Sequence, residues 1–200
     1  MRRPVPLLLT LVLLVCAPAL AACGGGDTQG GPSTIPDPSA PDRPIALNGV
    51  ATNLDLDPQT VGILDDNNVS ITPIPPARRS ALGIRFPIVG GEVRPDSLDG
   101  RIEHAGGIAL SDGVRRISLR RLIIDTRTGQ LTADAGSGRL PIFNLDLASG
   151  KRLDVGGVFT LGNIPVKLAA GAAAAIDEAL RIPVLTASIP IGFATVRATG

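Results

Sequence analysis

Residues 117–133, ISLRRLIIDTRTGQLTA, hold the pattern that decides the fold. Apolar and polar residues alternate over 117–119 and again over 131–133, which is the period of a strand with one buried face. Thr128-Gly129 supplies turn residues between the two runs. The stretch therefore predicts two antiparallel strands joined by a short turn.

The same stretch contains a change of parity. Ile117 and Leu119 are two residues apart, but the next apolar residue, Leu122, falls on the opposite parity after Arg120-Arg121. Successive side chains of a strand point to opposite faces, so both runs can be buried together only if one extra residue is inserted. A β-bulge is predicted at the two arginines.

Alternating apolar runs and turn residues continue on both sides of this stretch, at spacings of about ten residues. The pattern predicts one mainly β domain over residues 45–200, an antiparallel β-sandwich or barrel-like fold with one or two short helices. The alternating runs are Ile84-Phe86-Ile88 and Phe143-Leu145-Leu147, and the predicted turns are Gly90-Gly91, Ser111-Asp112-Gly113, Gly136-Ser137-Gly138 and Ser149-Gly150.

Two segments have helical rather than strand periodicity. Residues 169–181 place alanine and leucine on one face, and Pro183 ends the segment. Residues 58–66 follow Asp57, a favoured N-cap, and begin with proline at the first helical position, with Asn67-Asn68 at the end. Both are expected to be short helices.

The N-terminus has the features of an export signal. Arg2 and Arg3 precede an apolar run over residues 6–22 that is too short and interrupted for a membrane span. Leu20-Ala21-Ala22-Cys23 resembles the lipobox of bacterial lipoproteins, which implies cleavage before Cys23 and acylation of its thiol, by palmitate or a similar chain. Residues 1–22 are thus interpreted as a lipoprotein signal peptide.

Lipid on Cys23 predicts attachment to the extracytoplasmic face of the cell membrane. Several acyl chains on one residue make such attachment durable, because a single chain binds reversibly. An ordinary secretory signal, cut after Ala22 and leaving a free thiol, is the alternative. Residues 24–44 are rich in Gly, Pro and Ser, so residues 23–44 are expected to form the lipidated cysteine and a disordered tether.

Composition limits the range of functions. The chain has 19 basic and 18 acidic side chains, and removal of Arg2 and Arg3 with the signal leaves 17 against 18. Without a basic excess, nucleic acid is not an expected partner. Tyrosine and tryptophan are absent and four phenylalanines supply the only rings, so the core must be aliphatic.

The residues that usually perform catalysis are scarce, which predicts that the protein is not an enzyme. The chain has one histidine, and neither a nucleophile elbow nor a phosphate-binding loop accompanies it. Three carboxylate pairs and three arginine doublets are interpreted as turn, helix-end and solvated positions rather than as sites, and no metal site is predicted. They are Asp55 with Asp57, Asp65 with Asp66, Asp96 with Asp99, Arg78-Arg79, Arg115-Arg116 and Arg120-Arg121.

His104 is the candidate ligand-binding residue. It precedes Gly106-Gly107, and glycines allow a backbone or a ligand to approach closely. Histidine is also a common metal ligand. The alternative interpretation is a surface histidine before a bulge.

Several short motifs, in this order, resemble the HtaA-like domain of actinobacterial surface proteins over residues 83–200. They are Phe86-Pro87-Ile88, Gly90-Gly91, Gly100-Arg101-Ile102-Glu103-His104, Gly106-Gly107-Ile108, Leu110-Ser111, Leu131-Thr132-Ala133, Leu145-Asp146-Leu147, Asn163-Ile164-Pro165 and the run over 168–175.

The resemblance implies an all-β domain with a helix near its C-terminal end. Characterised members bind haem at the cell surface through a tyrosine ligand assisted by a histidine, and His104 matches the histidine-glycine-glycine motif. The tyrosine has no counterpart, because this chain contains none. His104 would then be the residue left to hold the iron.

The sequence thus favours a lipid-anchored, extracytoplasmic domain that binds or displays an unknown ligand or envelope protein without catalysis and without a cofactor. Two alternatives remain open at this point. One is haem or metal binding through His104, and the other is a structural role in the cell envelope.

Overall fold

The structure is a computed structural model that describes residues 43–183 and 185–200. It is mainly β, with antiparallel strands and two α-helices, which confirms the predicted fold class. The elements are β1 (Ile45–Ala46), β2 (Asn48–Leu56), α1 (Pro58–Asp66), β3 (Ser70–Ile74), β4 (Arg78–Ser80), β5 (Gly83–Phe86), β6 (Ile88–Val93), β7 (Gly100–His104), β8 (Gly107–Ser111), β9 (Arg116–Asp125), β10 (Gln130–Asp134), β11 (Arg139–Leu145), a 3₁₀ turn (Leu147–Ser149), β12 (Lys151–Val155), β13 (Val158–Leu168), α2 (Ala170–Leu180) and β14 (Pro190–Thr199).

The predicted signal peptide and Cys23 lie outside the described residues. Ser39–Gly200 forms one compact unit, and the buried hydrophobic residues of the described chain all lie within it. This unit therefore contains its own core and is expected to fold by itself. Among the described residues, no helix has the length and apolar character needed to span a membrane.

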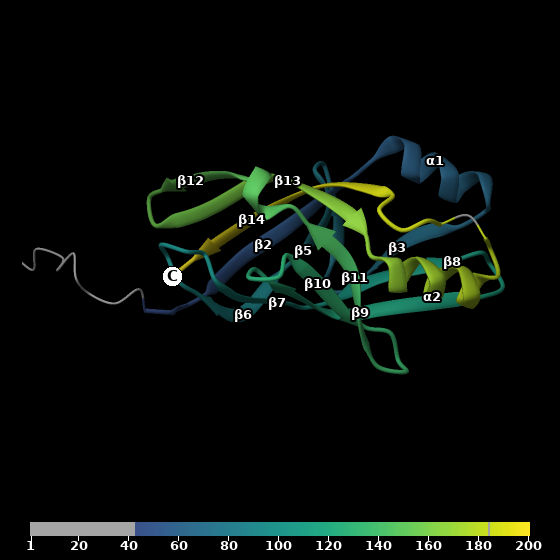
Figure 1. Cartoon of the computed structure of the whole chain (residues 1–200), viewed down its shortest axis with the longest axis horizontal. Helices are drawn as coiled ribbons and strands as arrows, with labels where there is room; N and C mark the ends of the chain where they lie inside the picture. Colours follow the sequence, from purple (N-terminus) through teal and green to yellow (C-terminus); the bar gives the residue numbers. More distant parts are fainter. Residues whose placement is uncertain (1–42, 184) are drawn as a thin grey trace, which may run out of the picture. The chain divides into compact units, whose positions relative to one another are not determined.

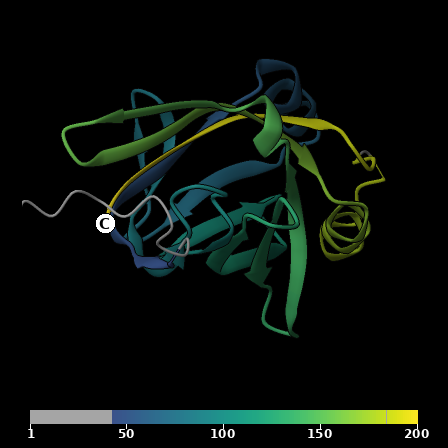
Figure 2. The same ribbon diagram turned by 60° about the vertical axis from the view of Figure 1, so that its left-hand side comes forward.

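The main sheet curls into a half-barrel (Figures 1 and 2), with the strand order β1-β6-β7-β9-β10-β11-β13-β14-β2-β5-β4. Its two sides meet where the backbone N–H of Leu47 donates to the carbonyl of Gly91 at 2.9 Å. Gly49 permits this approach, since a Cβ atom there would lie 2.1 Å from the Cβ of Ile88. Because the sheet curls in this way, side chains from its different strands face a common interior.

Strand β9 contains the predicted bulge. Ile123 pairs with Thr132 and Arg120 pairs with Asp134, so two residues of β9 oppose one residue of β10. Arg121 has φ +48°, a left-handed conformation. Its insertion allows Leu119 and Leu122 to be buried together in the interior.

Both predicted helices are confirmed. The carboxylate of Asp57 caps α1 by accepting from the backbone N–H groups of Gln59 and Thr60 at 2.9 and 3.1 Å. Asn67 is the C-cap of α1, as the sequence indicates. Helix α2 ends at Leu180, and its C-cap residue Arg181 is left-handed with φ +56°.

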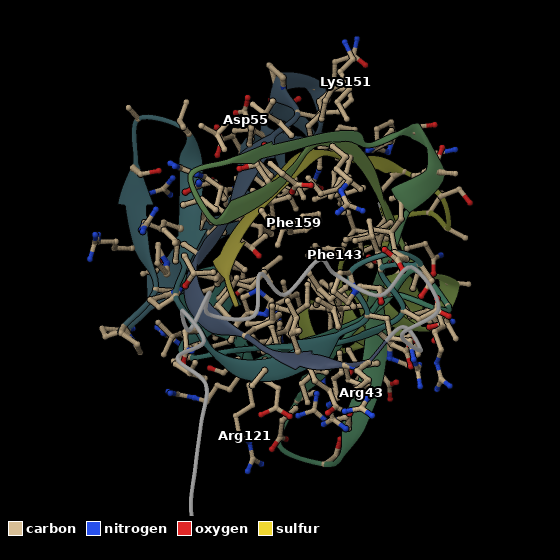
Figure 3. The ribbon with its side chains drawn as sticks, turned by 90° about the vertical axis from the view of Figure 1, so that its left-hand side faces the viewer. Arg43, Asp55, Arg121, Phe143, Lys151 and Phe159 are labelled. Carbon is tan, nitrogen blue, oxygen red and sulfur yellow. The ribbon has the colours of Figure 1, made fainter. Side chains whose placement is uncertain are left out.

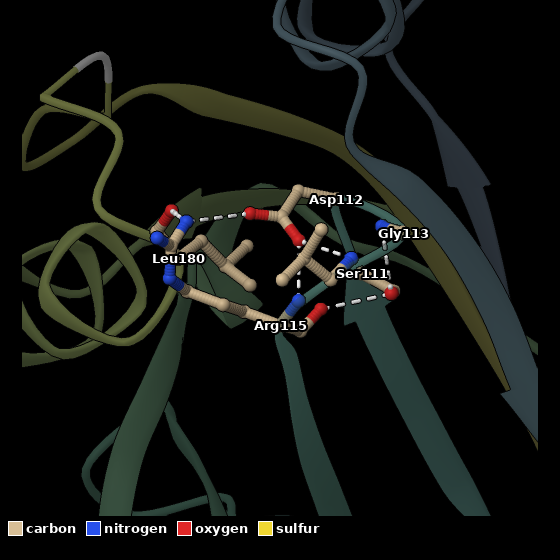
Figure 4. Close-up of polar contacts among 6 residues, drawn as sticks. Ser111, Asp112, Gly113, Arg115 and Leu180 are labelled. Carbon is tan, nitrogen blue, oxygen red and sulfur yellow. Dashed lines mark hydrogen bonds and ion pairs between the residues drawn. The ribbon is translucent and has the colours of Figure 1, made fainter.

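The two helices lie at the same end of the half-barrel (Figure 1), with Leu64 of α1 and Ile176 of α2 buried against the core. A turn after β8 also reaches α2 (Figure 4), because the guanidinium of Arg115 donates to the carbonyl of Leu180 at 3.2 Å. A cation at the C-terminal end of a helix meets its unsatisfied carbonyls and its negative dipole end. The helices thus cover one end of the sheet.

The expected turn at Gly90-Gly91 is wrong, because both glycines lie inside β6. The pairing of β6 with β7 shifts between Ile88 and Gly90, so the pair marks a bulge rather than a chain reversal. Gly91 has φ +119°, and a Cβ atom there would lie 2.1 Å from the carbonyl oxygen of Arg101. Glycine is needed for close backbone approach within the sheet.

Candidate functional site

His104 is the last residue of β7 and points into the half-barrel, where 4% of its surface is exposed. The interpretation of a surface histidine is therefore wrong. The bulge of β9 lies beside it, since the backbone N–H of Arg121 donates to the carbonyl of Gly106 at 3.1 Å. The strand corner between β7 and β8 and the bulge of β9 together place the imidazole inside the core.

Both ring nitrogens of His104 have partners inside the protein. Nδ1 lies 3.2 Å from the carbonyl oxygen of Leu122, and Nε2 lies 2.7 Å from the hydroxyl of Thr52. A carbonyl only accepts, so Nδ1 carries the proton and donates to Leu122. The hydroxyl of Thr52 then donates to the unprotonated Nε2, which fixes one neutral tautomer.

Burial away from water lowers the pKa of His104 from its ordinary 6.5 to about 4, although the hydrogen bond to Leu122 acts in the opposite direction. The ring is therefore neutral at physiological pH. This agrees with the hydrogen bonds, because only a neutral ring can accept from Thr52.

The glycines after His104 admit backbone rather than a ligand. A Cβ atom on Gly106 would lie 2.5 Å from the carbonyl oxygen of Ile74, and one on Gly107 would lie 2.0 Å from that of Leu119. Strands β3 and β9 occupy the space that a side chain would need. The histidine-glycine-glycine motif is thus explained by strand packing around a buried ring.

The residues around His104 do not fit haem in this arrangement. The hydroxyl that contacts the histidine belongs to Thr52, an aliphatic alcohol that is itself 4% exposed. The cavity beside the two residues holds about 20 Å³, enough for a single water molecule, whereas ligand pockets usually hold about 300–1,000 Å³. Iron could reach Nε2 only if the contact with Thr52 broke and the core opened.

The carboxylates of the three pairs lie at helix ends, at an exposed strand position and in a connection between strands. Asp57 caps α1, Asp65 and Asp66 end the same helix, and Asp55 is exposed on β2. Asp96 and Asp99 lie in the connection between β6 and β7. Within residues 43–183 and 185–200, no group of three or more His, Cys, Asp or Glu side chains is placed to hold a metal.

The arginine doublets do not converge on one site. Arg121 forms an ion pair with Asp134 on the outside of the sheet, and Arg79 donates to the carbonyl of Ile71 at 2.6 Å. Arg115 binds the end of α2 and also the carboxylate of Asp112, at 3.0 Å. The backbone N–H groups of Arg115 and Val114 hold the pKa of Asp112 below its ordinary 3.8 (Figure 4).

Larger cavities lie at the end of the half-barrel opposite the helices. Two adjoining cavities of about 210 and about 190 Å³ share Val93, Leu98 and Phe159, and we call them together the end pocket. Figure 3 looks onto this end and shows Phe159 and Phe143 within the ring of strands. The remaining lining residues are Ile45, Leu47, Pro95, Ser97, Ile102, Ile124, Thr126, Leu147, Ala148, Arg152, Asp154, Gly157, Val158, Leu161, Val196, Thr199 and Gly200.

Arg152 lines the outer cavity of the end pocket with a side chain that is partly exposed, and we call this part of the lining the mouth. Its guanidinium is 5.3 Å from the centre of the Phe159 ring and donates to the carbonyl of Pro95 at 2.8 Å. It also pairs with Asp154 at 2.9 Å. The arginine therefore connects β12 with the segment that follows β6 and provides the charged rim of an apolar pocket.

The end pocket was not identified from the sequence. No short motif joins its walls, which come from five separate parts of the chain, within residues 45–47, 93–102, 124–126, 147–161 and 196–200. One local feature of the sequence relates to the pocket. Charged and apolar residues alternate in β12, and the charged residues Arg152 and Asp154 are the ones that line the pocket.

A solved structure shares this fold. The C-terminal domain of HtaA from Corynebacterium glutamicum matches with a TM-score of 0.59 at 14% sequence identity, over 77% of this chain and 98% of that one. No protein-family model matches the chain, and no curated protein matches it by sequence. At this identity the likeness shows a shared fold, and it agrees with the HtaA-like motifs in the sequence.

Proposed function

We propose that this protein is a non-catalytic binding domain of HtaA-like fold, displayed on the extracytoplasmic face of the cell membrane by lipid on Cys23, and that its ligand occupies the end pocket. The observation that carries the proposal is the end pocket itself. Its two cavities are each about ten times the volume of the cavity beside His104, and concave apolar pockets with a few polar groups at the rim are the usual form of ligand sites.

The chemistry of the described residues supports binding rather than turnover. The one histidine is buried, neutral and hydrogen-bonded at both nitrogens. A general base must lie within hydrogen-bond distance of the substrate proton that it abstracts, and a substrate cannot reach this buried ring. A broad hydrolase screen on residues 39–200 is expected to give no turnover, and robust turnover that survives repurification would overturn the proposal.

The anchor rests on Leu20-Ala21-Ala22-Cys23 and the charged, apolar segment before it. Expression of the full chain in a bacterial host should place the protein in the membrane fraction, with an acylated N-terminal cysteine detectable by mass spectrometry. Cys23→Ala should move it out of that fraction. An unmodified Cys23 on a protein found free in the culture fluid would contradict the anchor and leave the pocket untouched.

Ligand binding can be tested before the ligand is known, with the dye anilinonaphthalene sulfonate, which fluoresces in apolar sites. Ala148 is exposed and lines the end pocket, so Ala148→Phe should fill it without disturbing the core. The dye should bind the wild-type domain and bind Ala148→Phe at least about tenfold more weakly, because the apolar surface that holds it is covered. Ala81→Phe, at an exposed turn away from the pocket, is the matched control.

A further inference from the structure

Resting on the proposed function of the end pocket, we infer that its ligand is the hydrocarbon chain of an amphiphile, which enters at Arg152 and lies in the end pocket with its tail toward Ile124. The inference concerns the chemical class of the ligand. It depends on how the cavities are arranged, on the polar groups inside them and on the position of the mouth.

The cavities form a line through the half-barrel. Ile124 lines both the end pocket and the small cavity beside His104, and Phe143 lines that cavity and the next one, of about 40 Å³, at the helix end. The open space is therefore largest in the end pocket and much smaller beside His104 and at the helix end. A flexible chain one carbon wide matches this shape, and a broad planar ring does not.

The inner cavities, beside His104 and at the helix end, offer no hydrogen bond to a polar ligand. Among the described residues, every buried side-chain nitrogen or oxygen already has a partner. His104 and Thr52, which line the inner cavity, are bound to each other. Apolar cavities of this kind stay dry and bind apolar molecules, and a polar group placed there would lose its water contacts without compensation.

The mouth has polar groups that the inner cavities lack. The guanidinium of Arg152 is partly exposed and lies over Phe159, with donors beyond those used by Asp154 and Pro95. An oxygen-rich head group can bind there while its chain lies below the ring. Since Arg152 is balanced by Asp154, the rim does not require a strongly anionic head group.

The mouth also lies where the chain joins the domain. Ile45, the first strand residue, lines the outer cavity of the end pocket, so the segment that leads back to Cys23 begins at its rim. In a lipid-anchored protein, this segment would hold the domain near the membrane. Acyl chains are the hydrocarbon most available there.

The test uses parinaric acid, a fatty acid that fluoresces when its chain enters an apolar site, with residues 39–200. It should bind the wild-type domain and the Ala81→Phe control equally, and bind Ala148→Phe at least about tenfold more weakly. Palmitate should displace it. Vesicles of phosphatidylglycerol form a second arm, because displacement by vesicles identifies membrane lipid as a source and displacement by palmitate alone identifies free fatty acid.

The outcomes separate this inference from the proposed function. If the naphthalene dye binds in an Ala148-dependent way and neither palmitate nor vesicles displace it, the acyl-chain inference fails and the binding domain stands. If the dye binds wild type no better than Ala148→Phe, both fail. Should Ala148→Phe not fold, stearate with a nitroxide at its tail replaces it as the test. The nitroxide should broaden the amide signal of Ile124 in the wild-type domain, and an unaffected Ile124 would overturn the inference.

Discussion

His104 stands where the end of β7 meets the bulge of β9, and its ring satisfies the Leu122 carbonyl that faces the interior there. This gives the histidine of the His-Gly-Gly motif a structural task that needs no ligand. The position of the motif beside two close-packed glycines was predictable from the sequence. The burial of the ring was not, because it depends on the curl of the sheet around it.

The lowered pKa of His104 predicts a stability that depends on pH. The unfolded chain binds this proton near pH 6.5 and the folded chain only near pH 4. Between these values the unfolded state holds more protons, so stability is full above about pH 6.5 and falls as the pH falls, by at most about 3 kcal/mol. Urea unfolding at several pH values measures this.

His104→Asn is the control, because its amide can still donate to Leu122 but does not titrate. The variant is expected to be less stable at pH 7 and to lack the part of the pH slope that wild type shows between pH 6.5 and 4. An identical slope in both proteins would contradict the assignment of a neutral, buried ring.

The contribution of the Thr52 hydroxyl to the free energy of unfolding can be predicted. Thr52→Val keeps the shape but leaves Nε2 of His104 buried without a donor, which should lower the free energy of unfolding by about 1–3 kcal/mol. Thr52→Ser keeps the hydroxyl and should recover the hydrogen bond. If Val proves as stable as Ser in urea unfolding, the contact does not hold the tautomer.

At the scale of elements, the sequence predicted most of what the structure contains. Residues 58–66 form a helix because Asp57 caps it and Pro58 is pre-set for the first turn, and these are local causes. The bulge in β9 followed from parity alone. The turn predicted at Gly90-Gly91 was wrong, because glycine is favoured both in turns and where two strands approach closely. The sequence does not show that the β7 backbone lies beside Gly91, and this neighbour is what requires glycine there.

The arginine doublet in β9 offers a test of the bulge. Arg121 is left-handed, a conformation that costs most residues about 1–2 kcal/mol and glycine nothing, so Arg121→Gly should roughly offset the loss of its exposed ion pair with Asp134. Arg120 is a regular strand residue, so Arg120→Gly should destabilise by about 0.5–1 kcal/mol. Thermal unfolding of both variants compares them, and a larger loss for Arg121→Gly would place the bulge elsewhere.

At the scale of the whole domain, the half-barrel has unequal ends. Helices α1 and α2 cover one end, and the other carries the end pocket. The sequence predicted the fold class because alternation and turns are repeated along the chain. It could not predict the pocket, since Leu98, Phe159 and Val196 become neighbours only after three distant parts of the chain have folded together.

The same contrast explains the difference between the site expected from the sequence and the site in the structure. His104 stood out because histidine is rare in this chain, but rarity does not place a residue on the surface. The pocket residues are common aliphatic side chains, so nothing in their identity marked them. Residues capable of chemistry could be identified from their type in the sequence. A concave apolar surface could be identified only once the fold was known.

The most direct test of the account compares the two candidate sites in one measurement. Amide signals of residues 39–200 are followed by NMR while palmitate and, separately, haemin are added to wild type and to His104→Asn. The account predicts that palmitate shifts Leu98, Ala148 and Phe159 in both proteins and that haemin produces no change that depends on His104. Shifts centred on His104 with haemin, abolished by the substitution, and an end pocket indifferent to palmitate would contradict it.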